Sequence, residues 1–262
     1  MEILSNPIGL LLVASGAFMA GAMNALAGGG TFFSFPALLA AGIPPVTANA
    51  SNTVALWPAS LSSAWVYRKE LQKHRSWVIS LTIIAAIGGV AGGLLLLAVS
   101  NSAFMQMVPW LLLLATALFG FSKQISALVI RVKSRMGIAH TDDKPHSPGG
   151  LAFQFLVTVY GGFFGAGQGI LTLAALSIQG VENIQELNAL KNWISGVTYT
   201  VSALTFIVAG AINWPYTILM VVTATLGGFA GAHIAKYLPA IWLKRLVITV
   251  GSLLTIIYFF KT

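Results

Sequence analysis

Long apolar segments separated by short polar turns make up most of the chain. The longer ones have roughly the 20 residues that an α-helix needs to cross a bilayer. They are continuously apolar and do not alternate in polarity as the strands of a transmembrane barrel do. The pattern therefore predicts an all-α, polytopic helical membrane protein. The expected segments are 7–27, 31–41, 48–66, 77–99, 106–123, 151–167, 169–179, 187–209, 214–235 and 242–260.

Two of these segments, 31–41 and 169–179, are too short to cross a bilayer. Each follows a glycine cluster, AGGG at 27–30 and GAGQG at 165–169. An interrupted helix at membrane depth is tolerated only where the freed backbone is buried in protein or lines a water-filled cavity. We therefore expect each short segment to form a broken pair with the helix before it.

The two halves of the chain resemble each other. GGVAG at 88–92 and GGFAG at 227–231 are separated by the same offset as AGGG and AGQG. Glycine runs of this kind commonly serve close helix packing. The pattern predicts two repeats, each a glycine-broken helix pair followed by three spanning helices. The expected units are a first transmembrane repeat at 1–123, a cytoplasmic linker at 124–150 and a second transmembrane repeat at 151–262.

Basic loops indicate orientation, because cytoplasmic loops carry an excess of Lys and Arg. The loops RKELQKHR at 68–75 and KYLPAIWLKR at 236–245 are basic, as is the linker. All three fall on one side if 151–179 enters and leaves the membrane on the same side. This assignment makes the two repeats inverted. It places the linker in the cytoplasm and both termini outside, in the inner membrane of a bacterial cell.

Composition narrows the expected partners. Charged residues make up 8% of the sequence, against about 25% in soluble domains. The formal net charge of +8 lies mainly in loops and does not indicate nucleic-acid binding. The sequence has no cysteine, so disulfides and thiolate metal sites are excluded. We expect a lipid bilayer and a small anionic substrate as partners, no cofactor and no metal, and either a monomer or a homodimer.

The glycine breaks are the candidate binding elements. Free N–H groups at the start of a half-helix carry about +0.5 of an elementary charge, which makes such a terminus a candidate anion site. In inverted repeats two such termini can face each other near the midplane. Nearby hydroxyl and amide side chains can donate hydrogen bonds to oxyanion oxygens. The predicted substrate-binding residues are Asn24, Gly29, Gly30, Thr31, Asn49, Ser51, Asn52, Gln168, Gly169, Thr172, Asn188, Lys191 and Asn192.

Lys191 is the ionisable member of this set. Ionisable groups inside membranes are costly and commonly functional, but a lysine about one turn into its helix can also snorkel to the interface. Asp and Glu are absent from the predicted spans, although Glu182 and Glu186 flank one. A dedicated carboxylate proton relay is therefore not expected. His233 could titrate near neutral pH, and a packed or interfacial histidine is the alternative interpretation.

The stretch AGAMNALAGGGTFFSFPALLAAGIPPVTANASNTVAL at 20–56, with GGFFGAGQGIL and LNALKNWISGV in the second half, resembles the sulfite exporter TauE/SafE family. This family is also called the toluene sulfonate uptake permease family. The resemblance implies a membrane transporter of two repeats, whose members are associated with sulfite, sulfoacetate and other organosulfonates. The motif residues that it transfers are Gly28, Gly29, Gly30, Pro36, Asn49, Ser51, Asn52, Gly165, Gly167, Gln168, Gly169, Lys191 and Asn192.

The expected function is export of a small sulfur-containing oxyanion, sulfite or an organosulfonate, by alternating access. Exporting one negative charge from a cell that is negative inside gains about 2.3 kcal/mol per 100 mV. Two alternatives stay open: an anion channel, and a proton-coupled importer of an organosulfonate or other small organic anion. An enzyme is not expected, because the spans lack a GxSG-type nucleophile and the aspartate-rich motifs of prenyl transferases.

Overall fold

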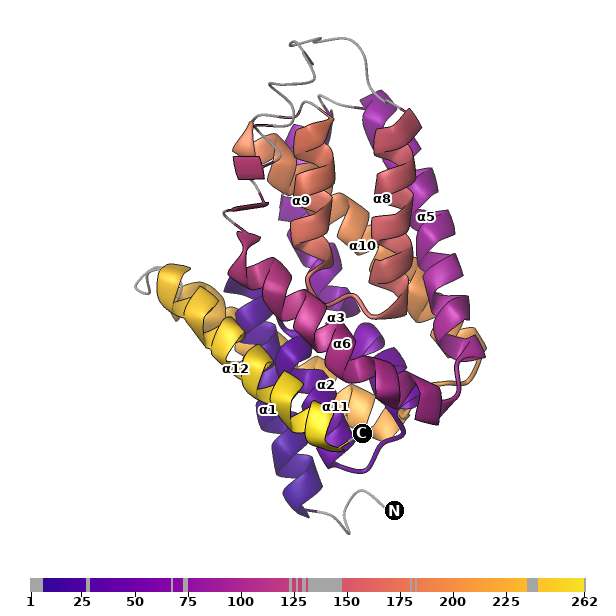
Figure 1. Ribbon diagram of the computed structural model, residues 1–262, viewed down its shortest axis with the longest axis vertical. Coiled ribbons are helices and arrows are strands. Elements are labelled where there is room, and N and C mark those ends of the chain that lie inside the picture. The colour runs from indigo at the N-terminus through magenta and orange to yellow at the C-terminus, as the bar shows by residue number, and fades with distance from the viewer. Residues whose placement is uncertain are drawn as a thin grey trace.

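The computed structural model describes residues 7–26, 29–66, 68–72, 75–122, 124–125, 127–128, 131, 148–179, 181, 183–234 and 240–261. The regular structure of these residues is helical (Figure 1). The helices are α1 (Pro7–Leu26), α2 (Thr31–Ala40), α3 (Pro45–Val66), α4 (Arg68–Leu71), α5 (Arg75–Ala98), α6 (Asn101–Gly120), α8 (Pro148–Phe163), α9 (Gln168–Ile178), α10 (Ile184–Val208), α11 (Trp214–Ile234) and α12 (Ala240–Lys261).

The helix boundaries agree with the predicted apolar segments to within one or two turns. Two details differ from the prediction. RKELQKHR was expected to be a loop, yet Arg68–Leu71 forms the single turn α4. Helix α8 begins at Pro148, inside the predicted linker, and proline is favoured at a helix start because its missing N–H needs no acceptor. Most of the predicted linker 124–150 lies outside the described residues.

Several helices have the length and apolarity of membrane spans. Among the described residues, the windows Pro7–Asn24, Trp77–Ala98 and Asn101–Gly120 are long and apolar enough to cross a bilayer, and shorter apolar stretches occur in α2, α8, α9 and α11. Large apolar side chains such as Leu156 and Phe260 are exposed on the outer surface, as expected where a protein meets lipid. The chain is a polytopic helical membrane protein.

The short helix α2 runs back along α1. A Cβ atom added at Gly16 of α1 would lie 2.6 Å from the Cβ of Ala37, and one added at Gly30 would lie 2.6 Å from the carbonyl oxygen of Ala20. The contacts move toward the start of α2 as they move toward the end of α1, so the two helices are antiparallel. Together they form the first hairpin.

The short helix α9 runs back along α8 in the same way. Gly161 of α8 faces the side chain of Gln168. At the far end of the pair, Gln179 Nε2 donates a hydrogen bond of 3.4 Å to the carbonyl oxygen of Gly150. These two contacts fix the antiparallel register of the second hairpin, which therefore returns toward the end of the molecule where α8 begins.

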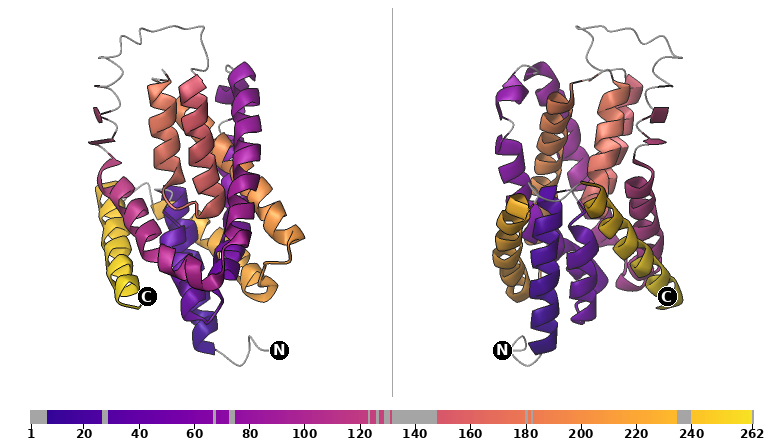
Figure 2. Two further views of the ribbon diagram at one scale, coloured as in Figure 1. Left: turned by 45° about the vertical axis from the view of Figure 1, so that its right-hand side comes forward. Right: turned by 90° about the vertical axis from the view of Figure 1, so that its left-hand side faces the viewer.

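The first helix of each half packs on the other half of the chain. Helix α1 lies along α11, and α8 lies along α5 (Figures 1 and 2). Glycines allow both approaches: a Cβ added at Gly227 would clash with the carbonyl oxygen of Phe18, and one added at Gly92 would clash with that of Val159. The two GGxAG runs are therefore helix-packing sites.

The hairpins approach the middle of the molecule from opposite ends. Helix α1 begins at the lower end in Figure 1, where α12 also ends, and α8 begins at the upper end. Between the hairpins, α3 and α10 pack against each other. Trp57 Nε1 of α3 donates a hydrogen bond of 2.9 Å to Thr200 Oγ1 of α10. This central pair thus links the two halves.

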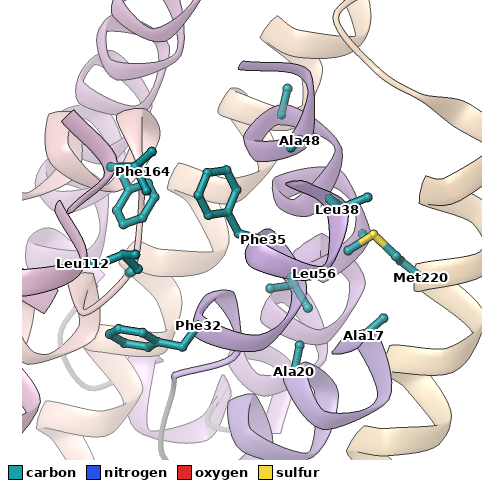
Figure 3. Close-up of a cluster of buried hydrophobic side chains, with 14 of the residues drawn as sticks. Ala17, Ala20, Phe32, Phe35, Leu38, Ala48, Leu56, Leu112, Phe164 and Met220 are labelled. Carbon is teal, nitrogen blue, oxygen red and sulfur yellow. The ribbon is translucent and has the colours of Figure 1, made fainter. Parts of the chain in front are cut away.

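The main apolar core surrounds α2 (Figure 3). Phe32, Phe35 and Leu38 of this helix are fully buried. The ring of Phe35 packs edge to face against Phe164, with ring centroids 5.6 Å apart, and against Phe104, with centroids 6.3 Å apart. The core therefore places the start of α2 beside the turn between α8 and α9.

Gly92→Ala is expected to destabilise the protein, whereas Gly93→Ala is not. A Cβ at residue 92 would clash with backbone atoms of α8, but one at residue 93 would meet only side chains at 3.5 Å. Alanine exceeds glycine in helix propensity by about 1 kcal/mol, while overpacking costs about 1–3 kcal/mol. Thermal unfolding of the purified variants in detergent would measure the difference.

Gly227→Ala and Gly228→Ala form a second matched pair at the α1–α11 contact. Gly227 touches the backbone of α1, whereas a Cβ at Gly228 has its nearest neighbour at 3.8 Å. Only Gly227→Ala should lower the melting temperature. Equal melting temperatures within both pairs would contradict the proposed role of the glycine contacts.

Candidate functional site

Glycine serves different purposes in the two breaks. In the second, Gly165 and Gly167 have φ angles of 80° and 79°, in the left-handed region that favours glycine. In the first, Gly30 has a helical φ of −57°, and its missing side chain instead permits contact with the backbone of α1 at Ala20. Gly28, a further motif residue, lies outside the described residues.

The second break is held by polar side chains from both halves. Tyr160 Oη donates a hydrogen bond of 2.6 Å to the carbonyl oxygen of Ala166. Asn49 Nδ2, from α3, donates one of 2.8 Å to the carbonyl oxygen of Phe163. These bonds pair backbone carbonyls that the end of α8 leaves free, which lipid could not do.

Tyr199 of α10 connects the two breaks. Its hydroxyl lies near the side chain of Thr31 at the start of α2. The same hydroxyl would lie 3.6 Å from a Cβ added at Gly165. Tyr199, which the sequence did not single out, therefore lies between the start of α2 and the turn before α9.

The first break has a closed hydrogen-bond network. Asn52 Nδ2 donates a hydrogen bond of 3.3 Å to Thr31 Oγ1, and the hydroxyl of Ser34 donates to Asn52 Oδ1. Thr31, Ser34 and Asn52 are all buried. The amide of Asn52 therefore uses both of its ends to hold α2 against α3. Binding a ligand here would require one of these bonds to open.

Ser51 has a clear structural partner. Its hydroxyl oxygen accepts a hydrogen bond of 2.9 Å from the backbone N–H of Asn213, just before α11. The Asn213 side chain in turn accepts one of 3.3 Å from the N–H of Tyr216. Ser51 therefore helps to fix the start of α11, and its side chain is occupied in this structure.

The second break, in contrast, contains polar atoms without partners. Gln168 Nε2 donates a long hydrogen bond of 3.4 Å to Thr198 Oγ1, while Gln168 Oε1 and Thr172 Oγ1 have no hydrogen-bond partner among the described residues. Asn49 Oδ1 has none either. Each buried polar group left unpaired costs about 1–3 kcal/mol. The second break is therefore the part of the site with unused capacity for a polar ligand.

Lys191 extends toward this part of the site. A Cβ added at Gly169, one residue into α9, would lie 3.5 Å from Lys191 Cδ. The lysine chain thus passes over the start of α9, and its side chain is half-buried. In the described helices the carboxylates are Glu70 and Glu186, each in the first turn of its helix. Lys191 therefore brings a basic side chain to the start of α9.

The remaining predicted site residues have less specific surroundings. Gly29 is buried, and a Cβ there would lie 3.1 Å from Val247 Cγ2, so α12 closes this side of the first break. Asn24 lies beside Gly30. Asn188 and Asn192 are half-buried on α10. The side chain of His233 lies outside the described residues.

Gln154 is a buried polar residue that the sequence interpretation missed. Its side chain is completely buried in α8, and neither its Nε2 nor its Oε1 has a partner among the described residues. The available signal was a lone amide in the otherwise apolar stretch LAFQFLV. No group of three or more His, Cys, Asp or Glu that could hold a metal occurs among the described residues.

Long apolar helices, two interrupted helices that meet inside the protein, and buried polar groups beside them define a membrane transport protein. Residues 13–258 match the family described as "Sulfite exporter TauE/SafE", and the chain belongs to this family. The match confirms the resemblance found in the sequence motifs. It also agrees with the expectation that the protein is a transporter and not an enzyme.

The chain is also similar to bacterial proteins named as transporters. It is 26% identical over 245 residues to a "Probable membrane transporter protein" of Haemophilus influenzae, covering 91% of this chain and 89% of that protein. It is 28% identical over 250 residues to the "Probable membrane transporter protein ORF9" of Sinorhizobium sp, covering 92% and 88%. It is 24% identical over 247 residues to YfcA of Escherichia coli K12, covering 91% and 85%. No solved structure matches significantly.

Asn52→Ala is expected to lower the free energy of unfolding by about 2 kcal/mol, because it removes the hydrogen bonds that its amide makes with the buried Thr31 and Ser34 hydroxyls. Asn188→Ala is the control, since Asn188 is half-buried and its side chain makes no hydrogen bond to another described residue. Its effect should stay within about 0.5 kcal/mol. Unfolding in mixed micelles would measure both, and two variants of equal stability would contradict this role of Asn52.

Proposed function

We propose that the protein carries a small sulfur-containing oxyanion, sulfite or an organosulfonate, across the bacterial inner membrane. The observation that supports this most is the second break, where a half-buried lysine lies beside buried polar atoms without partners among the described residues. An anion of this size would supply the negative charge that Lys191 lacks and the acceptor that Thr172 Oγ1 lacks. The description of the family as sulfite exporters supports the substrate class.

Donors are available for the oxygens of such an anion. Thr172 carries a free hydroxyl, and Gln168 can turn its amide so that Nε2 faces a ligand. The start of α9 adds a partial positive charge. Several of its amides are already used, since the N–H of Gln168 donates to Gly165 O and that of Ile170 to Gly167 O. We therefore assign the larger share of binding to Lys191, Gln168 and Thr172.

We infer that the two halves form inverted repeats that rock about this site. The opposite directions of α1 and α8 support this (Figure 1), as does the reciprocal packing of α1 on α11 and α8 on α5. Backbone contacts at Gly92 and Gly227 leave little freedom for these pairs to slide. Each pair would therefore move as one rigid body during alternating access.

Export can run on the membrane potential alone. Moving one negative charge outward gains about 2.3 kcal/mol per 100 mV, and the described helices offer no chain of carboxylates for protons. We place the basic turn α4 and the start of α8 on the cytoplasmic side, following the positive-inside rule. Both termini then lie outside, and either a monomer or a homodimer is compatible with this arrangement.

An anion channel is the principal alternative, because a channel could use the same polar groups. A proton-coupled importer of an organosulfonate is the second. A carrier turns over slowly and saturates with substrate, whereas a channel conducts far faster. Flux counted per protein molecule in liposomes would distinguish the two.

Lys191→Ala should reduce sulfite flux into liposomes at least about tenfold, which corresponds to about 1.4 kcal/mol of lost binding. Lys191→Arg, which keeps the positive charge, should retain more flux. Lys261→Ala is the control, because Lys261 is exposed at the end of α12. Normal transport by folded Lys191→Ala would remove Lys191 from the site.

Flux should also follow an imposed voltage. Liposomes with a potassium diffusion potential should accumulate sulfite or an organosulfonate on the positive side without a pH gradient. A benzoate control tests for selectivity among small anions. Flux that does not depend on voltage and requires a proton gradient would favour the proton-coupled importer instead.

A further inference from the structure

The two helices of the second hairpin face each other along a defined pair of stripes. Contacts at Gly161 with Gln168, and at Gly150 with Gln179, fix the two ends of this interface. Positions on one helical face recur every three to four residues. The facing stripe of α8 is therefore 150, 154, 157 and 161, and that of α9 is 168, 172, 175 and 179. We call this interface the α8–α9 seam.

Unpaired polar atoms are concentrated on this seam. They are Gln154 Nε2 and Oε1, Gln168 Oε1, Thr172 Oγ1 and Gln179 Oε1, all buried and without a hydrogen-bond partner among the described residues. They occur from the break, at Gln168, to the end of the molecule where α8 begins, at Gln179. Polar groups spaced in this way through an apolar hairpin need partners that the protein does not supply.

The corresponding seam of the first hairpin is different. Gly16 meets Ala37 and the backbone of Phe33, and Gly30 meets the backbone of Ala20. These positions are apolar and in close contact. The Ser34 hydroxyl nearby is paired with Asn52 and with the carbonyl oxygen of Gly30. These positions of the first seam are therefore filled by close contacts, although both hairpins are antiparallel pairs of helices.

We propose that the α8–α9 seam is a hydrated passage, through which a small anion moves between the second break and the end of the molecule where α8 begins. Water satisfies the amide and hydroxyl groups when no anion is present. The small residues Gly150, Ala175 and Gly161 keep side-chain bulk out of the seam. The identity of the anion rests on the proposed function, whereas hydration of the seam does not.

The chemistry of the seam suits the passage of an anion. Its groups are neutral, so an anion is hydrogen-bonded without being trapped by a fixed charge. Lys191 lies at the inner end, over Gly169. The amide of Gln168 lies directly on Gly161 and so closes the passage on the side of the break. A turn of this one side chain would join the passage to the binding site.

The natural lack of cysteine allows a direct test. Gln154→Cys and Thr172→Cys are made in the full chain and exposed to a small, membrane-impermeant anionic methanethiosulfonate from either face of the membrane. The cysteine thiolate attacks the reagent's sulfenyl sulfur, which forms a mixed disulfide and releases methanesulfinate. A thiol ionises readily only in contact with water. Gly149→Cys, at an exposed position at the start of α8, marks the face at which α8 begins.

Both seam cysteines should react from the face that labels Gly149→Cys, at least ten times faster than two controls. Ala37→Cys lies in the first seam, and Leu156→Cys lies on the exposed apolar face of α8. Thr172→Cys is nearly isosteric and should preserve the fold. Seam cysteines as unreactive as the controls, in protein that unfolds normally, would overturn the proposal.

Gln154→Leu supplies an independent readout. A passage predicts at least about tenfold slower anion flux, whereas a purely structural glutamine predicts unchanged flux, which would count against the proposal. The proposed substrate is tested separately, because labelling involves no transported anion. If the seam cysteines are labelled but the protein carries no sulfite, the proposed substrate is wrong and the proposed passage is supported. If the protein carries sulfite but the seam cysteines are not labelled, the proposed passage is wrong and the proposed substrate is supported.

Discussion

A helix interrupted inside a membrane leaves backbone groups that lipid cannot pair, and this constraint shapes the centre of the molecule. The carbonyl oxygens of Phe163 and Ala166 are paired by Asn49 and Tyr160. Tyr199 links the start of α2 to the turn before α9. The hydrogen-bond partners of the second break therefore come from both halves of the chain.

The sequence predicted the helices well, because runs of apolar residues report directly on length and burial. It also predicted that α2 and α9 follow breaks and lie near each other. It could not predict that α1 packs on α11, because an apolar sequence indicates that a helix is removed from water but does not identify the helix against which it packs. Nor could glycine identity alone show that Gly167 needs a left-handed φ while Gly30 needs space.

The candidate site was predicted in part. The polar positions around both breaks are buried, but their bonding state depends on side-chain directions that no spacing reveals. Asn52 and Ser51 prove to be engaged with other residues, whereas Gln168 and Thr172 keep unpaired atoms. Where the first break has Gly29, the second has Gln168. Two segments of similar shape thus differ in polarity.

The packing of α1 on α11, in the other half of the chain, also affects the order in which the fold can form. Helix α1 leaves the ribosome long before its packing partner α11. The small-residue face of α1 around Gly21, which is in contact with the backbone of Ala224 in the folded protein, must wait in the bilayer until α11 has been inserted. Domains commonly fold in order during synthesis, but the contact between α1 and α11 can form only after the helices between them have been made. Formation of this contact therefore depends on synthesis of the second half.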